Sequence, residues 1–417
     1  MERSTTFFLL RLTYLLLVLP YGCVSPEDIT LRGTVNVVVI EGTITNRAET
    51  MVIRLNRSRA DSLTGRFGTL PLTKASVDVV VDSAQVMACQ ETTAGTYQLP
   101  SDFKGQIGHA YQLRFTLADG SSYVSSQEVM QPVPSISRVT AQFNPVAFSP
   151  GFIQGFTAGH ELFLDTIDPA DQPNYYRWEW TLYEPQEWCR SCYEGIYIEN
   201  ALIPILPYTY PYYYSSSTQP YEDCFYPPLG TPAHVGLINH RYDYPCRTQC
   251  WEILYSHAIN VFSDQYTNGG LIARKNVAQI PYYQARPCLV NIRQESLTKD
   301  AYQYYDLFQQ QTQKTGGLVD TPPTALGGNV HNVAKQNEIV VGYFTASAVA
   351  NQPYYLDRHD AGSAPYPGLF FALTGRDSPR PEDRTEQAFI LNTPRPPTAV
   401  CGPIDQRTPY KPEGWKN

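Results

Sequence analysis

The chain carries little charge for its length and has no basic block or stripe. Its 417 residues include 31 Lys and Arg against 39 Asp and Glu, a net charge of −8, and charged residues make up only 17%. Nucleic-acid phosphates are bound by clustered Lys and Arg side chains. The composition therefore argues against nucleic acid as a partner.

Past its first two dozen residues the sequence also lacks long apolar runs. A membrane-spanning helix needs about 20 consecutive, mostly apolar residues. No later run comes near that length, so we expect no internal membrane span.

Motifs of hydrolytic and phosphate-transferring enzymes are missing as well. We find no Gly-x-Ser-x-Gly, no phosphate-binding loop and no His-Glu-x-x-His. The seven histidines show no metal-ligand spacing, and we interpret the charged run 357–360 as polar surface. We therefore expect no enzyme activity, no catalytic residues, no cofactor and no resident metal.

Tyrosine, proline and glycine are abundant, with 31, 34 and 27 residues. Tyrosine favours strands, and proline and glycine mark turns. Alternating apolar segments recur at 37–44, 52–58, 75–82, 95–100 and 109–126. This pattern predicts a mainly β protein in which residues 35–132 form an Ig-like or prealbumin-like β-sandwich. Asp119-Gly120 predicts a two-residue hairpin turn within it.

Residues 133–417 predict a larger β-rich domain with one helix. Strands are expected at 161–169, 174–185, 251–263 and 339–349. Another is expected over 280–296, where Pro287 indicates a bulge or an edge. Apolar residues at helical spacing predict a helix over 298–315. Residues 188–250 are expected to form an irregular insertion stapled by cysteines.

The N-terminus is typical of an export leader. Arginines flank an apolar core over 12–19, and a small residue precedes Cys23. This order predicts a signal peptide over 1–22. A cysteine just past the cleavage point predicts lipid attachment at Cys23, where two or more acyl chains would give a stable anchor. Residues 23–34 would then be a tether. The alternative is an ordinary cleaved leader with Cys23 incidental.

Eight cysteines remain once Cys23 is set aside, an even number that suggests disulfides in an exported chain. The candidate disulfide residues are Cys189, Cys192, Cys224, Cys246, Cys250, Cys288 and Cys401. Spacing does not select a pairing. The alternative is a four-thiolate zinc site made of Cys189, Cys192, Cys246 and Cys250. An oxidising destination favours disulfides over free thiolates.

The insertion also contains tyrosines separated by prolines. They are Tyr208, Tyr210, Tyr212, Tyr213, Tyr214, Tyr221 and Tyr226. Tyrosine offers rigid contact area at low entropic cost together with a hydroxyl group. This loop is therefore a candidate binding surface for protein, peptide or glycan. The alternative is a loop packed over its own domain and tied down by the cysteines.

The order of several segments resembles one known family. These segments are VVVIEGTI, the series SVDVVV, AGTYQL, GQIGHAYQL and DGSSYVS, then MQPVPSI, AYQYYDLFQQQ, TPPTALGGNV, EIVVGYFTAS and KPEGW. Together they resemble the Bacteroidota surface lipoproteins of domain-of-unknown-function family 4249. Cys401 departs from the pattern, because the family often has a second cysteine close after it. The resemblance implies an outer-membrane lipoprotein that works with a TonB-dependent receptor, and it implies no catalytic residues.

We therefore expect a non-enzymatic surface lipoprotein, lipid-anchored in the outer membrane. It would be an accessory or ligand-capture component of a TonB-dependent receptor. The alternative, from a different class, is a stand-alone surface module that binds a glycan or peptide.

Overall fold

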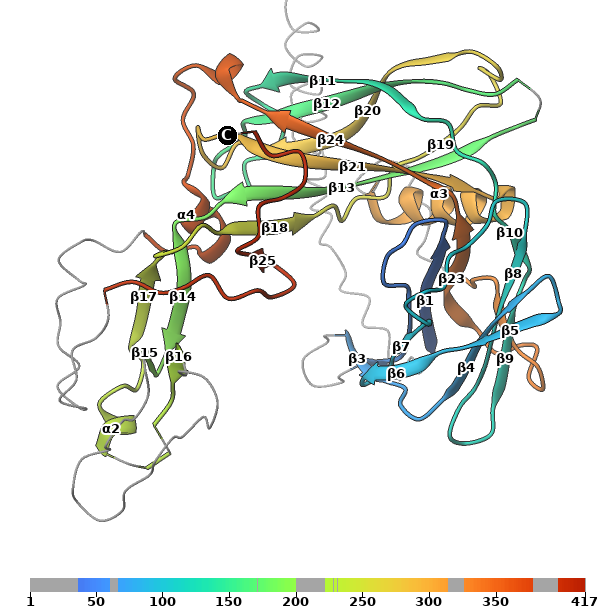
Figure 1. The fold of residues 1–417 in the computed structure, drawn as a ribbon, viewed down its shortest axis with the longest axis horizontal. Helices are drawn as coiled ribbons and strands as arrows, with labels where there is room; N and C mark the ends of the chain where they lie inside the picture. The colour runs from blue at the N-terminus through green and yellow to red at the C-terminus, as the bar shows by residue number, and fades with distance from the viewer. Residues whose placement is uncertain are drawn as a thin grey trace, which may run out of the picture.

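The computed structural model describes residues 37–60, 67–170, 172–199, 222–227, 229–230, 232–313, 326–377 and 397–416. These residues form a β-sandwich, a second β body stacked on it, and an arm that projects from the second body (Figure 1). The protein is mainly β, as the sequence predicts.

The sandwich consists of two sheets. The first contains β1 (Val38–Thr45), β2 (Val52–Ala60), β3 (Phe67–Pro71), β6 (Gln90–Thr93), β7 (Thr96–Gln98) and β23 (Val340–Ser347). Its order is β23-β1-β2-β7-β6, with β3 on β2. The second contains β4 (Ser76–Val81), β5 (Gln85–Ala88), β8 (Ala110–Thr116), β9 (Ser122–Ser125), β10 (Glu128–Val129) and β22 (Val330–Asn332). Its order is β22-β9-β8-β4-β5, with β10 on β8.

The alternating residues of these strands fill the space between the sheets. Val38 and Ile40 on β1, Ile53 on β2 and Leu113 on β8 are all buried in one core. Because side chains alternate across a strand, the polar residues between them face outward. The alternation in the sequence therefore predicted these strands.

Two strands from far along the chain complete the sandwich. β23 pairs with β1 in parallel, in register from Val38–Val340 to Thr45–Ser347, and β22 pairs with β9. Gly342 makes the close approach possible. Its φ is +96°, and a Cβ there would lie 1.8 Å from the carbonyl oxygen of Ile40. The sandwich thus extends beyond the expected range 35–132.

The hairpin between β8 and β9 differs in detail from the expected two-residue turn. The Leu117 and Ser121 backbones are hydrogen-bonded, and the Gly120 N–H donates to the Leu117 carbonyl at 2.9 Å. Gly120 has φ +86°. The loop therefore holds three residues, a type I turn ending in a left-handed glycine. Asp119 stabilises it by accepting from the Ser121 N–H at 2.9 Å.

The second body also has two sheets. One has the order β11-β12-β20 and contains β11 (Ile136–Asn144), β12 (Gly159–Ile167) and β20 (Leu271–Pro281). The other has the order β24-β21-β13-β18-β25, with β19 on β13. Its strands are β13 (Tyr175–Pro185), β18 (Trp251–Tyr255), β19 (Val261–Ser263), β21 (Cys288–Leu297), β24 (Val349–Leu356) and β25 (Arg407–Thr408). Leu162, Trp178 and Ile292 are buried between the sheets.

Two strands expected to be continuous are broken. The segment 251–263 is divided into β18 and β19. The segment 280–296 is divided where β20 ends at Pro281 and β21 begins at Cys288. Pro287 lies in the connection and not in a bulge, because proline has no N–H to donate to a strand ladder.

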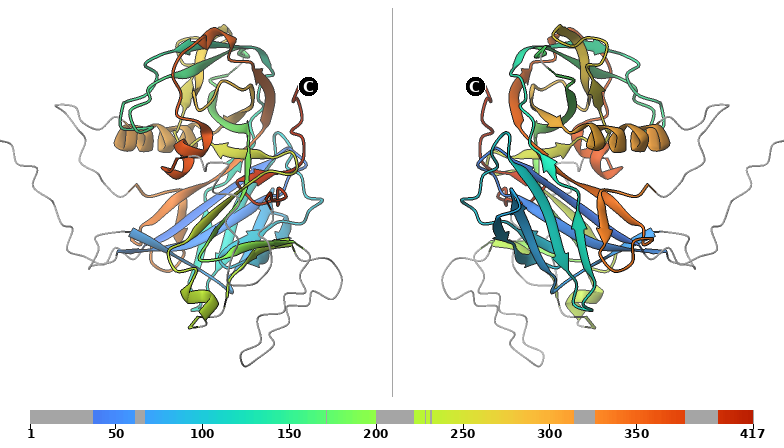
Figure 2. Two further views of the ribbon diagram at one scale, coloured as in Figure 1. Left: turned by 90° about the vertical axis from the view of Figure 1, so that its left-hand side faces the viewer. Right: turned by 90° about the vertical axis from the view of Figure 1, so that its right-hand side faces the viewer.

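The expected helix over 298–315 is confirmed as α3 (Lys299–Gln313). Thr298 caps it, since its Oγ1 accepts from the Ala301 N–H at 3.3 Å. The helix lies between the two bodies (Figure 2), where the hydroxyl of Tyr304 accepts from the Gly342 N–H at 3.2 Å. The short helices are α2 (Pro232–Val235), η1 (His359–Ala361) and α4 (Leu369–Thr374). Within the described ranges, no helix has the length and apolar character to cross a membrane.

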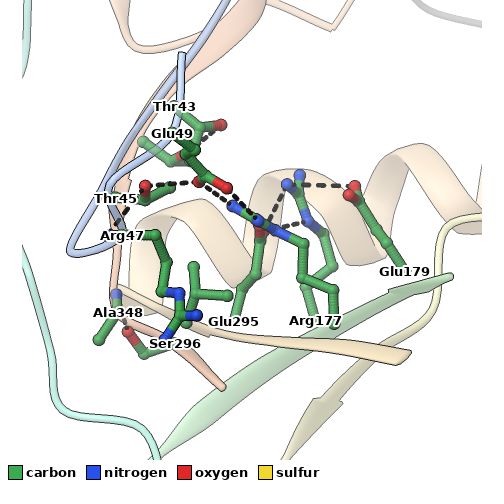
Figure 3. Close-up of polar contacts among 12 residues, drawn as sticks. Thr43, Thr45, Arg47, Glu49, Arg177, Glu179, Glu295, Ser296 and Ala348 are labelled. Carbon is green, nitrogen blue, oxygen red and sulfur yellow. Dashed lines mark hydrogen bonds and ion pairs between the residues drawn. The ribbon is translucent and has the colours of Figure 1, made fainter. Parts of the chain in front are cut away.

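A chain of ion pairs joins the two bodies (Figure 3). Arg293 on β21 donates two hydrogen bonds, of 2.8 and 2.9 Å, to the carboxylate of Glu49 in the β1–β2 loop of the sandwich. Arg293 also donates to Glu295 at 2.6 Å, and Arg177 donates to the other Glu295 oxygen at 2.6 Å. Arg177 in turn pairs with Glu179. The Arg293–Glu49 pair crosses the boundary, and the bonds of Glu295 within the second body hold Arg293 in place for it. Together they fix how the second body, and the arm on it, sit on the sandwich.

Candidate functional site: a disulfide-braced arm

The arm is made of two short ribbons inserted between β13 and β18. β14 (Trp188–Tyr193) pairs with β17 (Arg241–Pro245), and β15 (Ile196–Glu199) pairs with β16 (Glu222–Phe225). The helix α2 lies at its far end (Figure 1). The insertion expected to be irregular is therefore built from regular antiparallel pairs in its described residues.

Three disulfides brace the arm and its root. Cys189–Cys246 links the two strands of the first ribbon, and Cys192–Cys224 links the first ribbon to the second. Cys250–Cys401 ties the start of β18 to the C-terminal segment. The lone C-terminal cysteine therefore has its partner at Cys250. In the chain-entropy model, closing loops of this length stabilises by roughly 3–5 kcal/mol per bridge.

Cys288, included among the candidate disulfide residues, is a free thiol. The residue is fully buried in the core of the second body, which contains none of the arm cysteines. Burial raises the pKa of its thiol well above the ordinary range. The prediction of a disulfide at Cys288 is therefore wrong, because its side chain points into an apolar core.

The zinc alternative is not supported, because the four cysteine sulfurs proposed as its ligands do not form one cluster. Cys192 pairs with Cys224, which lies outside the proposed ligand set. The sulfurs that do gather, within 4.8 Å of one another, belong to Cys189, Cys250 and Cys401. All three are oxidised in disulfides, whereas zinc is bound by thiolates.

Aromatic packing fills the interior of the arm. The rings of Tyr197 and Tyr244 lie 5.3 Å apart, and both residues are buried among the disulfides. The Tyr244 hydroxyl accepts from the Tyr197 N–H at 2.9 Å. The Tyr197 hydroxyl accepts from the Val400 N–H at 3.2 Å. These bonds tie the C-terminal segment to both ribbons, so the arm has its own small core.

The outer end of the arm exposes apolar side chains. The residues of this apolar tip are Tyr193, Tyr226, Leu229, Val235 and Ile238. Leu229 is 86% exposed and Val235 is 60% exposed. The Arg241 guanidinium lies 5.0 Å from the centre of the Tyr193 ring. A group of large apolar side chains on a braced projection is typical of a surface that another molecule covers.

Part of the sequence-based site lies outside the described residues. This holds for Cys23 and for Tyr208, Tyr210, Tyr212, Tyr213, Tyr214 and Tyr221, as well as for the leader and the tether. Tyr226 is described, and it is half exposed at the apolar tip. Gly195 leaves room for its ring, since a Cβ at that position would lie 2.8 Å from the Tyr226 Cδ1.

A cavity of about 350 Å³ opens at the root of the arm. Its lining includes Glu187, Trp188, Arg286, Tyr366 and Phe370. The rings of Trp188 and Phe370 lie 4.9 Å apart, and Arg286 pairs with Glu187 at 2.9 Å. Aromatic faces beside a few polar groups are the usual make-up of a small-ligand pocket.

One wall of this root cavity is held by a buried ion pair. Arg358 and Glu184 have side chains that are fully buried and paired. Arg358 also donates to the backbone carbonyls of Gln284 and Arg286, both at 3.0 Å. The interpretation of 357–360 as polar surface is therefore wrong at Arg358, whose side chain is fully buried.

A family model described as "Domain of unknown function (DUF4249)" matches residues 24–353. The chain belongs to this family. The match covers the sandwich, the arm and the second body as far as β24, and it ends before Cys401. No curated protein matches the chain. The family membership inferred from the serial order of segments is thereby confirmed.

Sequence reasoning found the arm but missed most of its surface. It selected tyrosines, whereas the described tip is mostly aliphatic, with Leu229, Val235 and Ile238. The signal was present in the sequence, because Leu229, Val235 and Ile238 do not follow a strand or helix period that would bury all three. The root cavity joins Trp188 to Phe370, which are far apart in the chain, and no local pattern predicts that contact.

Proposed function

We propose that this protein is a non-enzymatic surface lipoprotein that serves as an accessory or ligand-capture component of a TonB-dependent receptor. The observation that carries the proposal is the arm, a disulfide-braced projection with an apolar tip. A rigid projection presents its tip without losing much conformational freedom on binding. The arm would contact the receptor's outer face, while the stacked bodies set its height above the membrane.

The expected location supports this proposal. A leader followed by Cys23 favours lipid attachment, and the family resemblance favours the outer membrane of a Bacteroidota cell. Ser25 to Asp28, a short acidic stretch, favours the outer leaflet. Replacing Cys23→Ala should release the mature protein from membranes into the soluble fraction. A variant that stays with the membrane would contradict the anchor.

Gentle detergent extraction tests the partnership. The wild-type protein is expected to co-purify with a TonB-dependent receptor in near-stoichiometric amount, identified by mass spectrometry. Recovery of the protein only as a monomer would contradict the proposal.

The root cavity favours a second candidate function, a stand-alone module for a glycan or peptide. Trp188 and Phe370 would supply the apolar wall, and Arg286 with Glu187 the polar contacts. Binding on a glycan or peptide array that is lost in Trp188→Ala, from a protein without a receptor partner, would favour this candidate.

A further inference from the structure

Two aspartates that the proposed function does not use are buried together in the second body. Asp168 follows β12 and Asp264 follows β19, and these residues are 2% and 0% exposed. Their carboxyl groups lie within hydrogen-bonding range of each other. Two carboxylates so close cannot both stay ionised without a positive partner.

Each oxygen of Asp168 already has a donor. Oδ1 accepts from the Tyr176 hydroxyl at 2.5 Å, and Oδ2 accepts from the Gly269 N–H at 3.1 Å. The Asp264 Oδ1 atom is different. It is buried and receives no hydrogen bond from the described residues. A buried carboxylate oxygen without a donor is costly, so it indicates a missing partner.

More oxygens surround the pair. The Asn174 side-chain nitrogen lies 3.1 Å from the Pro169 carbonyl, 2.9 Å from the Gln172 carbonyl and 3.4 Å from Asp264 Oδ2. Two carbonyl oxygens and one carboxylate oxygen therefore surround the Asn174 side-chain nitrogen. Besides burial, the groups that act most strongly on the Asp264 carboxyl are Asn174 and Asp168, and neither carries a positive charge.

We propose that this cluster, centred on Asp168 and Asp264, binds a divalent cation and prefers Ca²⁺ to Mg²⁺. Hard cations take oxygen ligands, and Ca²⁺ accepts six to eight of them in irregular geometry, whereas Mg²⁺ requires a compact octahedron. The two carboxylates supply the charge, and the carbonyls of Pro169 and Gln172 supply neutral ligands. Rotation of the Asn174 amide would add its oxygen to the set.

One residue of the cluster, Asn174, borders a cavity. The cavity measures about 210 Å³, and its other walls include Gln131, Pro132 and Lys299. Gln131 and Pro132 belong to the connection between the sandwich and the second body, and Gln172 donates to Gln131 at 3.4 Å. A bound cation would therefore tie the β12–β13 loop beside that connection.

In the metal-free protein a proton is the competing partner. Burial, together with Asp168, raises the pKa of Asp264. A carboxyl whose folded pKa is raised stabilises the fold below its unfolded pKa, and that contribution is lost as pH rises through the folded value. The groups facing it are Asp168, Tyr176 and Asn174. A shared proton is therefore the alternative to a bound cation at this carboxyl pair.

The test uses the mature chain after chelator treatment, with CaCl₂ or MgCl₂ added at pH 7. We expect Ca²⁺ to raise the Tm, with weaker response to Mg²⁺, and titration calorimetry to give one Ca²⁺ per chain. Asp264→Asn should weaken Ca²⁺ binding by more than about 100-fold, since changes outside the ligand set alone cost 10–100-fold. Asp119→Asn, on an exposed hairpin, is the matched control and should leave binding unchanged.

If Asp264→Asn fails to fold, native mass spectrometry of the wild-type protein still tests the site by counting the calcium ions bound to each chain. One calcium retained per chain supports the site. No Tm response, no binding heat and no retained calcium would overturn it and leave a carboxyl pair that shares a proton. None of these readings involves a receptor, so they stand apart from the proposed function.

Discussion

Glu184 and Arg358 illustrate how single residues hold the arm's root in place. Both side chains are fully buried, and the side-chain amide of Gln284 donates to Glu184 at 2.8 Å. Neither charge can be satisfied by water, so each depends on the other. Loss of one partner of such a pair leaves a buried charge uncompensated.

Arg358→Ala is expected to lower the free energy of unfolding by about 3–5 kcal/mol. Urea unfolding would measure the change. The matched control is Arg54→Ala, which removes an exposed pair with Glu41 and should cost about 0–1 kcal/mol. Equal effects from the two variants would contradict the structural role of Arg358.

The ion pairs between the bodies predict a response to acid. Burial alone would raise the pKa of Glu49, but its hydrogen bonds from Arg293 and Thr45 hold it below the ordinary value of 4.5. Burial alone would also raise the pKa of Glu295, but its ion pairs with Arg177 and Arg293 hold it below the ordinary value. A carboxylate with a lowered folded pKa stabilises the fold above its unfolded pKa, and that contribution is lost as pH falls through the folded value.

Glu49→Gln should therefore reduce stability at pH 7 and lessen the further loss on acidification below about pH 4.5. Unfolding in urea at pH 7 and at pH 3.5 measures both effects. Glu41→Gln removes the same charge from an exposed, weakly paired site and serves as the control. If both variants show the same pH dependence, Glu49 does not join the bodies through its charge.

At the scale of elements, the arm depends on its disulfides more than on its ribbons. Two-stranded ribbons are marginally stable alone, and the buried side chains between these ribbons include Cys192 and Cys224 themselves. The bodies, by contrast, have apolar cores that do not include the arm. The arm should therefore open separately when a bridge is removed.

Replacing both Cys192 and Cys224 by Ser should make the arm susceptible to protease while the bodies keep their strand signal in circular dichroism. The bridge closes a loop with a sequence separation of 32, so the loss is about 3–4 kcal/mol in the chain-entropy model. Limited proteolysis with mass mapping would locate the cuts. Cys89→Ser, at a free cysteine, should leave the digestion pattern unchanged, and cuts spread over the bodies would contradict separate opening.

Most elements could be predicted because their burial is periodic. Tyr176, Trp178 and Leu182 mark the inner face of β13 by alternation, and α3 follows from its helical spacing and Thr298. The breaks were harder to predict. Residues 256–260 leave the strand, although neighbouring residues on both sides alternate, because β18 and β19 pair with different parts of β13. The alternation of apolar residues indicates which side chains are buried. It does not indicate which neighbouring strand a segment pairs with.

The whole molecule is closed by contacts between distant parts of the chain. β1 and β23 pair in parallel although some 300 residues separate Val38 from Val340. Neither segment has a sequence feature that identifies the other as its pairing partner. The strand over 339–349 could therefore be predicted, but its place in the sandwich could not. The pairing of Cys250 with Cys401 and the meeting of Asp168 with Asp264 belong to the same class. They follow from topology and not from local pattern.

Gly342→Ala tests this closure. A Cβ at Gly342 would overlap the Ile40 carbonyl oxygen, and the residue has positive φ. Gly108→Ala is the matched control, because Gly108 has φ +86° but open space around it. The control should lose about 1–2 kcal/mol from backbone strain alone, whereas Gly342→Ala should lose clearly more, measured by thermal unfolding. Similar losses would mean that β1 and β23 can separate without cost.

The proposed function assigns receptor binding to the apolar tip of the arm. Its direct test is co-purification of the receptor with the double variant Leu229→Ser/Val235→Ser. The control is Val146→Ser/Leu271→Ser, which changes the same two residue types at exposed positions of the second body. We expect at least a tenfold drop in recovered receptor for the tip variant, roughly 1.4 kcal/mol or more, and wild-type recovery for the control. Undiminished recovery with the tip variant would contradict it.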